Sequence, residues 1–248
     1  ASKKSRLILP NLLTLIGVCL GISSIKFAID QNYNIAVIFL IFAALLDTLD
    51  GRIARLIKGT SEFGKELDSL TDFVSFGIAP AFILYFWELK NYGKIGWAIT
   101  LIFSVCCVLR LARFNLTKIS EDDEWKGNYF EGIPSPAGAI LILLPLIYEL
   151  SELQLSLDIK KFTPYLVVAV SILLISNIPT FSLKKIKVSS QLTIFLLFGL
   201  VIIFVSLIFF TFKALLVLGL LYLVSIPASY FLYKRTSKKL SKILKEDD

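Results

Sequence analysis

The chain has 248 residues, of which 56% are hydrophobic, and its mean hydropathy is +0.77. This composition excludes an ordinary water-soluble domain and indicates a polytopic membrane protein. The net charge of +7 does not indicate nucleic-acid binding, because the basic residues stand at the ends of apolar segments, where they suit anionic lipid headgroups. The lack of histidine excludes a Ser-His-Asp triad, a histidine-rich zinc site and a phosphohistidine intermediate, so any bound metal must have oxygen ligands.

Eight apolar segments approach the length of about 20 residues that a membrane-spanning helix needs. In chain order they predict helices over residues 7–29, 33–56, 70–87, 95–116, 133–150, 165–179, 192–211 and 214–233. The polar stretch 58–66 is interpreted as a turn, and the stretch 117–132 as a longer loop. Because the connections are short, we expect an all-α fold, a single polytopic transmembrane helical bundle of about eight helices.

The basic residues predict the orientation of this bundle. They gather before the first helix, after each even-numbered helix and in the tail 234–248, whereas the other connections contain few. The positive-inside rule therefore places both termini and the even-numbered connections in the cytoplasm. For the tail, two interpretations stay open: an amphipathic helix on the membrane surface or a frayed end.

Four aspartates stand in the second and third predicted helices. Asp47 and Asp50 are three residues apart near the end of the second helix, and Asp68 and Asp72 are four apart, so each pair shares one helical face. A short connection makes these helices antiparallel, which brings the four carboxylates together near the cytoplasmic ends. Ionisable residues inside a membrane are costly and indicate function.

Clustered carboxylates repel one another unless cations lie between them. Oxygen ligands favour Mg²⁺ or Mn²⁺, and a pair of such ions about 4 Å apart can hold a diphosphate. Gly51, Ala54 and Gly64 lie near the acids. Small residues at these positions suit either close approach of a ligand to the backbone or close helix packing, and both interpretations stay open.

The complete motif reads Asp47-x-x-Asp50-Gly51-x-x-Ala54-Arg55 followed by Gly64-x-x-x-Asp68-x-x-x-Asp72. It resembles the signature of the CDP-alcohol phosphotransferase family at every position. The resemblance implies two divalent cations, Mg²⁺ or Mn²⁺, held by the four aspartates and bridged by the CDP diphosphate, with Asp72 as general base. It also implies a nucleotide pocket lined by Gly51, Ala54, Arg55 and Gly64.

The resemblance further implies a six-helix core, here residues 1–187, followed by two additional helices at 188–233 and the basic tail 234–248. Family members are commonly homodimers, so a homodimer is expected.

Two further segments resemble the branch of the family that makes phosphatidylserine. These are Arg110-Leu-Ala-Arg113-Phe-Asn115 and the stretch 130–139, which contains Ser135. This resemblance implies CDP-diacylglycerol and L-serine as substrates within a membrane of lipids. Arginines at a helix end suit serine's carboxylate or a lipid phosphate, although anchoring by the positive-inside rule would also explain them. Asn115 and Ser135 are assigned to the same anion site. Asn11 and Thr14 in the first helix are candidate nucleotide contacts.

Two other classes of acceptor and one other function are alternatives. A phosphorylated acceptor, glycerol 3-phosphate or an inositol phosphate, should require a denser basic cluster, and choline should require an aromatic cage. A cation transporter could also place four acids in a bundle, but transporters favour inverted repeats and broken helices. The sequence shows no internal repeat.

Overall fold

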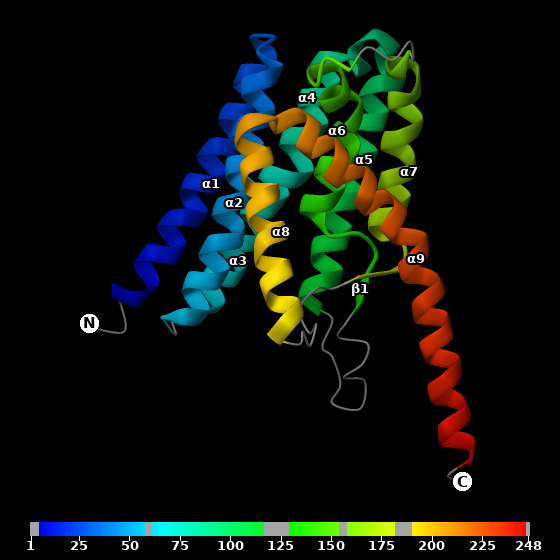
Figure 1. Ribbon diagram of the computed structural model, residues 1–248. Coiled ribbons are helices and arrows are strands. Elements are labelled where there is room, and N and C mark those ends of the chain that lie inside the picture. The colour runs from blue at the N-terminus through cyan, green and yellow to red at the C-terminus, as the bar shows by residue number, and fades with distance from the viewer. Residues whose placement is uncertain (1–4, 58–60, 117–128, 154–157, 182–189, 247–248) are drawn as a thin grey trace.

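The computed structural model describes residues 5–57, 61–116, 129–153, 158–181 and 190–246, and these are almost entirely helical (Figure 1). The helices are α1 (Ser5–Ile29), α2 (Tyr33–Leu56), α3 (Glu62–Asp72), η1 (Phe73–Ile78), α4 (Ala79–Trp87), η2 (Leu89–Tyr92), α5 (Gly93–Leu116), α6 (Ser135–Leu150), η5 (Ile159–Phe162), α7 (Thr163–Ile175), α8 (Ser190–Phe209) and α9 (Thr211–Glu246). Strands β1 (Tyr129–Glu131) and β2 (Pro179–Phe181) form a small antiparallel sheet. The predicted helical bundle is confirmed, with this sheet as an addition.

Each of the eight predicted segments contains a helix. Within the residues that the structure describes, five stretches are long and apolar enough to cross a membrane, namely Ile8–Ile29, Tyr33–Leu56, Glu62–Trp87, Leu89–Leu116 and Thr211–Thr236. The helices Ser135–Leu150 and Leu197–Phe209 are apolar but shorter, and α7 has 13 residues. The chain is therefore an integral membrane protein.

The third helical stretch begins earlier than predicted, so the interpretation of residues 58–66 as a turn is wrong from Glu62 onward. The reason is a helix cap: the Gly64 backbone N–H donates to Ser61 Oγ at 3.0 Å, which satisfies one of the unpaired donors of the first turn. The sixth predicted helix is also too long, since α7 ends at Ile175 and the chain then enters β2.

The tail is helical as far as Glu246, so the interpretation as a frayed end is wrong for the described residues, while a position on the membrane surface stays a prediction. Helix α9 runs without interruption from Thr211 to Glu246, and its last turns project beyond the bundle (Figure 1). The last span and the basic tail are thus one continuous helix as far as Glu246.

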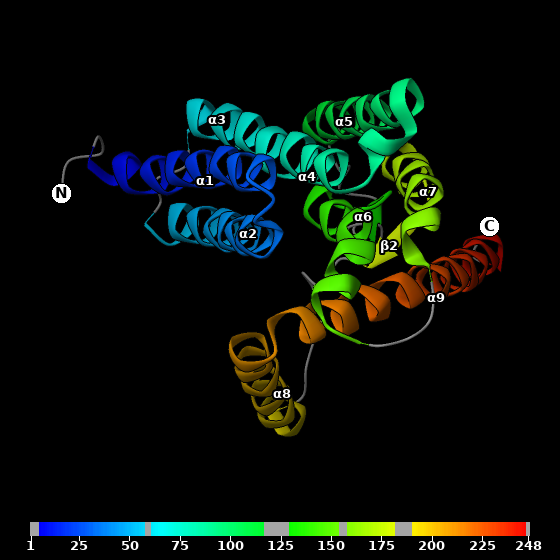
Figure 2. The same cartoon turned by 90° about the horizontal axis from the view of Figure 1, so that it is seen from above.

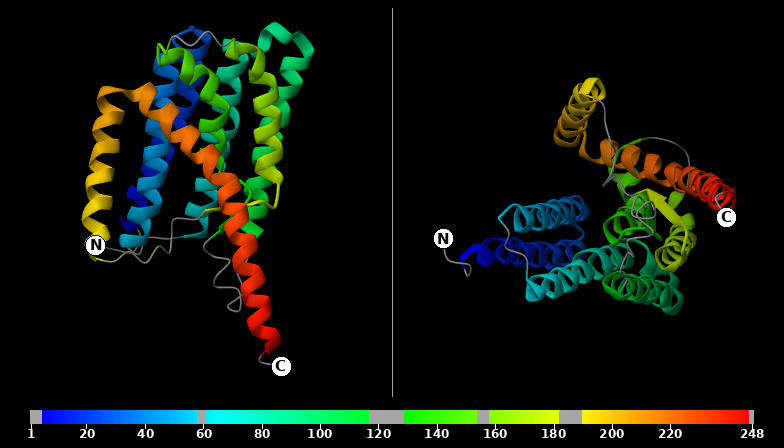
Figure 3. Two further views of the ribbon diagram at one scale, coloured as in Figure 1. Left: turned by 45° about the vertical axis from the view of Figure 1, so that its right-hand side comes forward. Right: turned by 90° about the horizontal axis from the view of Figure 1, so that it is seen from below.

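Helix α6 lies at the centre of the bundle, between α4, α7 and α9 (Figure 2). Its side chains Leu141, Ile142, Leu146 and Ile147 are almost fully buried. Helices α1 and α2 pack together along one side, and α5 packs against α7. Helix α8 stands on the outer side of α9, away from α1 to α7 (Figure 3), and its described apolar side chains are mostly exposed, as suits contact with lipid.

The sheet brings the turn before α6 against the end of α7. Gly132 adopts a φ of +74°, and its backbone N–H donates to the Ile178 carbonyl at 2.9 Å. A Cβ atom at Gly132 would lie 2.8 Å from the carbonyl oxygens of Leu174 and Ser176. This position therefore requires glycine both for its backbone conformation and for space.

We expect Gly132→Ala to lower the free energy of unfolding by about 1–3 kcal/mol, because the left-handed backbone is strained for alanine and the added methyl group meets backbone oxygens. Gly199→Ala in α8 is the matched control, since nothing lies within 4 Å of a Cβ atom there. Thermal unfolding in detergent measures both variants. Equal melting temperatures for Gly132→Ala and the unmodified protein would contradict the proposed strain.

Candidate active site

Helices α2 and α3 bring the predicted acids together. Oxygens of Asp47, Asp50 and Asp68 all lie within 4.8 Å of one another. Asp72, one turn beyond Asp68, lies close enough to Asp47 for the two carboxyl groups to interact directly. Its Oδ1 atom is buried and has no hydrogen-bond partner among the described residues. A cluster of carboxylates, one of which has a buried oxygen without a hydrogen-bond partner among the described residues, can bind a divalent cation.

Helix α1 supports this cluster from the side. The Thr14 hydroxyl lies 2.5 Å from Asp50 Oδ2 and 3.0 Å from the Pro10 carbonyl oxygen, so it can donate to either. Both Thr14 and Asp50 are buried, at 5% and 3% exposure. Thr14 thus orients one of the acids, and its predicted contact with a nucleotide stays a prediction.

The small residues of the motif differ in their surroundings. A Cβ atom at Gly64 would lie 3.2 Å from Ser61 Oγ and 3.3 Å from Asn11 Oδ1, so Gly64 serves the close packing of α3 against α1. At Gly51 the nearest atom would be Arg55 Nη1, 3.9 Å away. Gly51 therefore leaves open space beside the acids, as close approach of a ligand requires. Ala54 is half-buried one turn further along α2.

The chain continues from Asp72 into η1, where the helix widens to π geometry over Phe73–Ile78. Such wide turns are common at functional sites. Here α1 approaches closely: a Cβ atom at Gly21 would lie 2.8 Å from Ser75 Oγ. The wide turn begins directly after Asp72 and therefore adjoins the acid cluster. The sequence motif gave no indication of it.

Arg110 joins the acid cluster to the start of α6. Its side chain is only 7% exposed, and Nη1 donates to Ser135 Oγ at 2.8 Å. The guanidinium lies over the Phe114 ring at 5.5 Å and close enough to Asp72 for their charges to interact. Its Nε atom is buried without a hydrogen-bond partner among the described residues.

Arg113 is placed differently from Arg110. Its guanidinium donates to the carbonyl oxygens of Ile175, Ser176 and Glu131 at 2.9, 3.0 and 3.4 Å, and to Asn177 Oδ1 at 2.8 Å. These contacts tie the end of α5 to the end of α7 and to β1. Arg113 therefore stabilises the fold beside the site, in the place where a cation suits the carboxyl end of a helix.

Two other predicted positions lie at the edge of the cluster. Asn115 Nδ2 donates to Ser69 Oγ at 2.9 Å and so links α5 to α3. Arg55 is exposed, and its charge interacts with Asp68. Asn115 is thus occupied by a helix-to-helix contact, while Arg55 lies at the open side of the acids.

Tyr222 of α9 was not anticipated from the sequence. Its hydroxyl oxygen is buried, and it lies beside Thr180 of β2 and near the Arg110 guanidinium. No motif includes this tyrosine, since the sequence after residue 187 offered only hydropathy.

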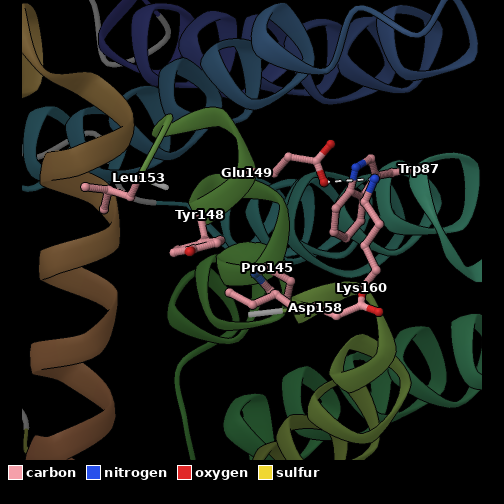
Figure 4. Close-up of a pocket in the computed structure, with 8 residues that line it drawn as sticks. Trp87, Pro145, Tyr148, Glu149, Leu153, Asp158 and Lys160 are labelled. Carbon is pink, nitrogen blue, oxygen red and sulfur yellow. Dashed lines mark ion pairs between the residues drawn. The ribbon is translucent and has the colours of Figure 1, made fainter. Parts of the chain in front are cut away.

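A separate cavity of about 250 Å³ lies at the carboxyl ends of α4 and α6 (Figure 4). The acids lie in α2 and in α3, which comes before the amino end of α4. It is lined by Trp87, Pro145, Tyr148, Glu149, Leu153, Asp158, Ile159 and Lys160. Lys160 forms an ion pair with Glu149 at 3.0 Å and lies 5.4 Å from the centre of the Trp87 ring. These contacts connect η5 to α4 and α6.

A known protein family matches the part of the chain that contains the motif. The family model for CDP-alcohol phosphatidyltransferases matches residues 7–174, which include all four acids, Arg110 and Ser135. The chain belongs to the CDP-alcohol phosphatidyltransferase family. The match covers the acid cluster and ends before β2, α8 and α9. CDP-alcohol phosphatidyltransferases depend on divalent cations, and the cluster of Asp47, Asp50 and Asp68 is suited to hold one.

Several relatives of this CDP-alcohol phosphatidyltransferase have named activities. A CDP-diacylglycerol–serine O-phosphatidyltransferase of Helicobacter pylori is 38% identical over 200 residues, which cover 81% of each chain. One from Mycobacterium tuberculosis is 37% identical over 182 residues, 73% of this chain and 63% of the relative. An archaetidylserine synthase of Methanothermobacter thermautotrophicus is 35% identical over 176 residues, 68% of each chain.

Proposed function

We propose that this protein transfers the phosphatidyl group of CDP-diacylglycerol to the hydroxyl of L-serine, giving phosphatidylserine and CMP. The observation that supports this most strongly is the buried Arg110, whose charge interacts with Asp72, because it brings a carboxylate-binding group into the region of a proton acceptor. The names of the relatives support the same substrates.

In this proposal Asp47, Asp50, Asp68 and Asp72 hold two divalent cations, Mg²⁺ or Mn²⁺. When bound, the cations neutralise the charge of the diphosphate and of the departing CMP. The open side of α2 at Gly51, with Ala54 and Arg55 near it, gives the nucleotide room to approach. Gly64, Asn11 and Thr14 are proposed as further nucleotide contacts, in addition to the packing contacts that they make.

Asp72 takes the proton from the serine hydroxyl, and the serine oxygen forms a bond to the lipid-side phosphorus as the bond from that phosphorus to CMP breaks. Arg110 binds the serine carboxylate, so the hydroxyl is directed toward Asp72. Ser135 fixes the guanidinium through its hydroxyl. This is a single displacement without a covalent enzyme intermediate.

The proposal places the active site and both termini in the cytoplasm. The distribution of basic residues supports this orientation. The start of α1 and the end of α9 lie on the side of the bundle where α2 ends and α3 begins (Figure 1). A homodimer with a six-helix core in residues 1–187 is also proposed, from the family resemblance.

The assignment is tested by comparing acceptors. Purified protein with CDP-diacylglycerol and Mn²⁺ or Mg²⁺ is supplied separately with serine, glycerol 3-phosphate, an inositol phosphate, choline and ethanolamine, and CMP release is measured. Serine should be the best acceptor, and ethanolamine should be poor because it lacks the carboxylate. Faster release with a phosphorylated acceptor or choline would contradict the assignment.

Arg110→Ala should raise the KM for serine by about ten- to a hundredfold, because one buried charge-assisted contact is lost. The KM for CDP-diacylglycerol should stay unchanged, and Arg110→Lys should restore serine binding only in part. Arg113→Ala is the matched control, expected to lower the melting temperature without raising the KM for serine. If Arg110→Ala weakened only CDP-diacylglycerol binding, Arg110 would be a lipid-phosphate contact.

A further inference from the structure

The last helix reaches the region around Arg110. Helix α9 crosses α6 and β2 on one side of the bundle (Figure 2). At this crossing Tyr222 lies beside Thr180, near the guanidinium of Arg110. Arg110 thus has Asp72 near it from one part of the chain and Tyr222 from another, and these two residues are 150 positions apart in the sequence.

Two polar atoms in this region are buried without a partner among the described residues: the hydroxyl oxygen of Tyr222 and Nε of Arg110. The Thr180 hydroxyl beside Tyr222 already donates to the Gly132 carbonyl at 2.7 Å, and no well-formed hydrogen bond joins it to the tyrosine. Buried polar groups in proteins are nearly always paired, so two unpaired groups in one region of the protein require an explanation.

Both unpaired groups can donate a hydrogen bond, and one belongs to a cation. A carboxylate accepts hydrogen bonds on both oxygens and is stabilised by a guanidinium. The anion could come from the acceptor, as a carboxylate, or from the lipid substrate, as a phosphate. The position of Arg110 beside Asp72 favours the acceptor, because the attacking hydroxyl has to reach Asp72.

We propose that Tyr222 is a specificity-determining residue of the acceptor site, where its hydroxyl and the Arg110 guanidinium together donate to the carboxylate of serine. This inference rests on the proposed function. It also gives α9 a direct role in the site, although the family match ends at residue 174, before this helix.

The test is Tyr222→Phe, which removes one oxygen and keeps the ring. The KM for serine should rise about tenfold, the usual effect of leaving a charged hydrogen-bond partner unpaired, while the KM for CDP-diacylglycerol and the melting temperature stay unchanged. Tyr230→Phe is the matched control on the same helix: Tyr230 is exposed, its ring faces Lys234 at 5.9 Å, and its variant should behave as the unmodified protein.

A double-variant comparison separates this role from a purely structural one. If Tyr222 and Arg110 bind the same carboxylate, the effects of Tyr222→Phe and Arg110→Lys on the KM for serine should not multiply when the two are combined. Independent, multiplying effects would overturn the shared contact.

The outcomes also separate this inference from the proposed function. An unchanged KM for serine in Tyr222→Phe, in a protein that releases CMP with serine, would overturn the inference alone. A rise in the KM for CDP-diacylglycerol instead of serine would overturn it in favour of a lipid phosphate. If the unmodified protein released no CMP with serine, the proposed function would fail first.

Discussion

Asp72→Asn should lower kcat by at least about a hundredfold, because an amide keeps the shape of the side chain but cannot accept the proton from serine. Asp72 interacts directly with Asp47, and its charge interacts with that of Arg110, so it is placed to act on an acceptor held by the arginine. Binding of CDP-diacylglycerol should persist, since Asp47, Asp50 and Asp68 are intact. Steady-state kinetics of CMP release and a separate nucleotide-binding measurement give the two quantities.

The control for this prediction is Asp30→Asn. Asp30 pairs with Lys26 on the surface at the other end of α1, so the same chemical change there should leave kcat unchanged. Turnover of Asp72→Asn near the normal rate would show that Asp72 is not the base. A loss of nucleotide binding as large as the loss of rate would identify it mainly as a metal ligand.

Removal of divalent cations should abolish turnover, and Mg²⁺ or Mn²⁺ should restore it. The reason is the composition of the cluster: Asp47, Asp50 and Asp68 offer only carboxylate oxygens within 4.8 Å of one another, and the diphosphate carries negative charge as well. Without cations these groups repel one another. CMP release in the presence of EDTA, followed by stepwise addition of each metal, measures the effect.

Alanine in place of Asp47, Asp50 or Asp68 should weaken metal binding and nucleotide binding together, because the diphosphate is held through the ions. Asp158→Ala is the matched control, since Asp158 lines the cavity at the opposite end of the bundle. Isothermal titration with metal and with a CDP compound measures both affinities. Full activity in EDTA, or nucleotide binding that survives loss of the acids, would contradict a metal site at this place.

The arrangement of the acids could be predicted from the sequence because it depends on local rules. Spacings of three and four residues put each pair on one helical face, and a short connection forces the two helices to run antiparallel. The start of α3 at Glu62 was missed because the stretch is polar. Ser61, a favoured residue for a helix N-terminus, was the signal that could have located it.

Other features depend on contacts between distant parts of the chain and therefore had no local signal. Strands β1 and β2 have three residues each and pair across about 50 positions. Arg110 and Arg113 are one turn apart and chemically alike, yet the charge of Arg110 interacts with Asp72, whereas Arg113 binds carbonyl oxygens at the end of α7. Tyr222 reaches the site only because α9 crosses β2.

The measurement that tests the account most directly is the stereochemical course at phosphorus. CDP-diacylglycerol made chiral at the lipid-side phosphorus with oxygen isotopes is converted with serine, and the configuration of the phosphatidylserine product is determined. A single displacement by the serine hydroxyl, with Asp72 as base, inverts the configuration. Retention would require two successive displacements through a covalent enzyme intermediate, and would contradict the account.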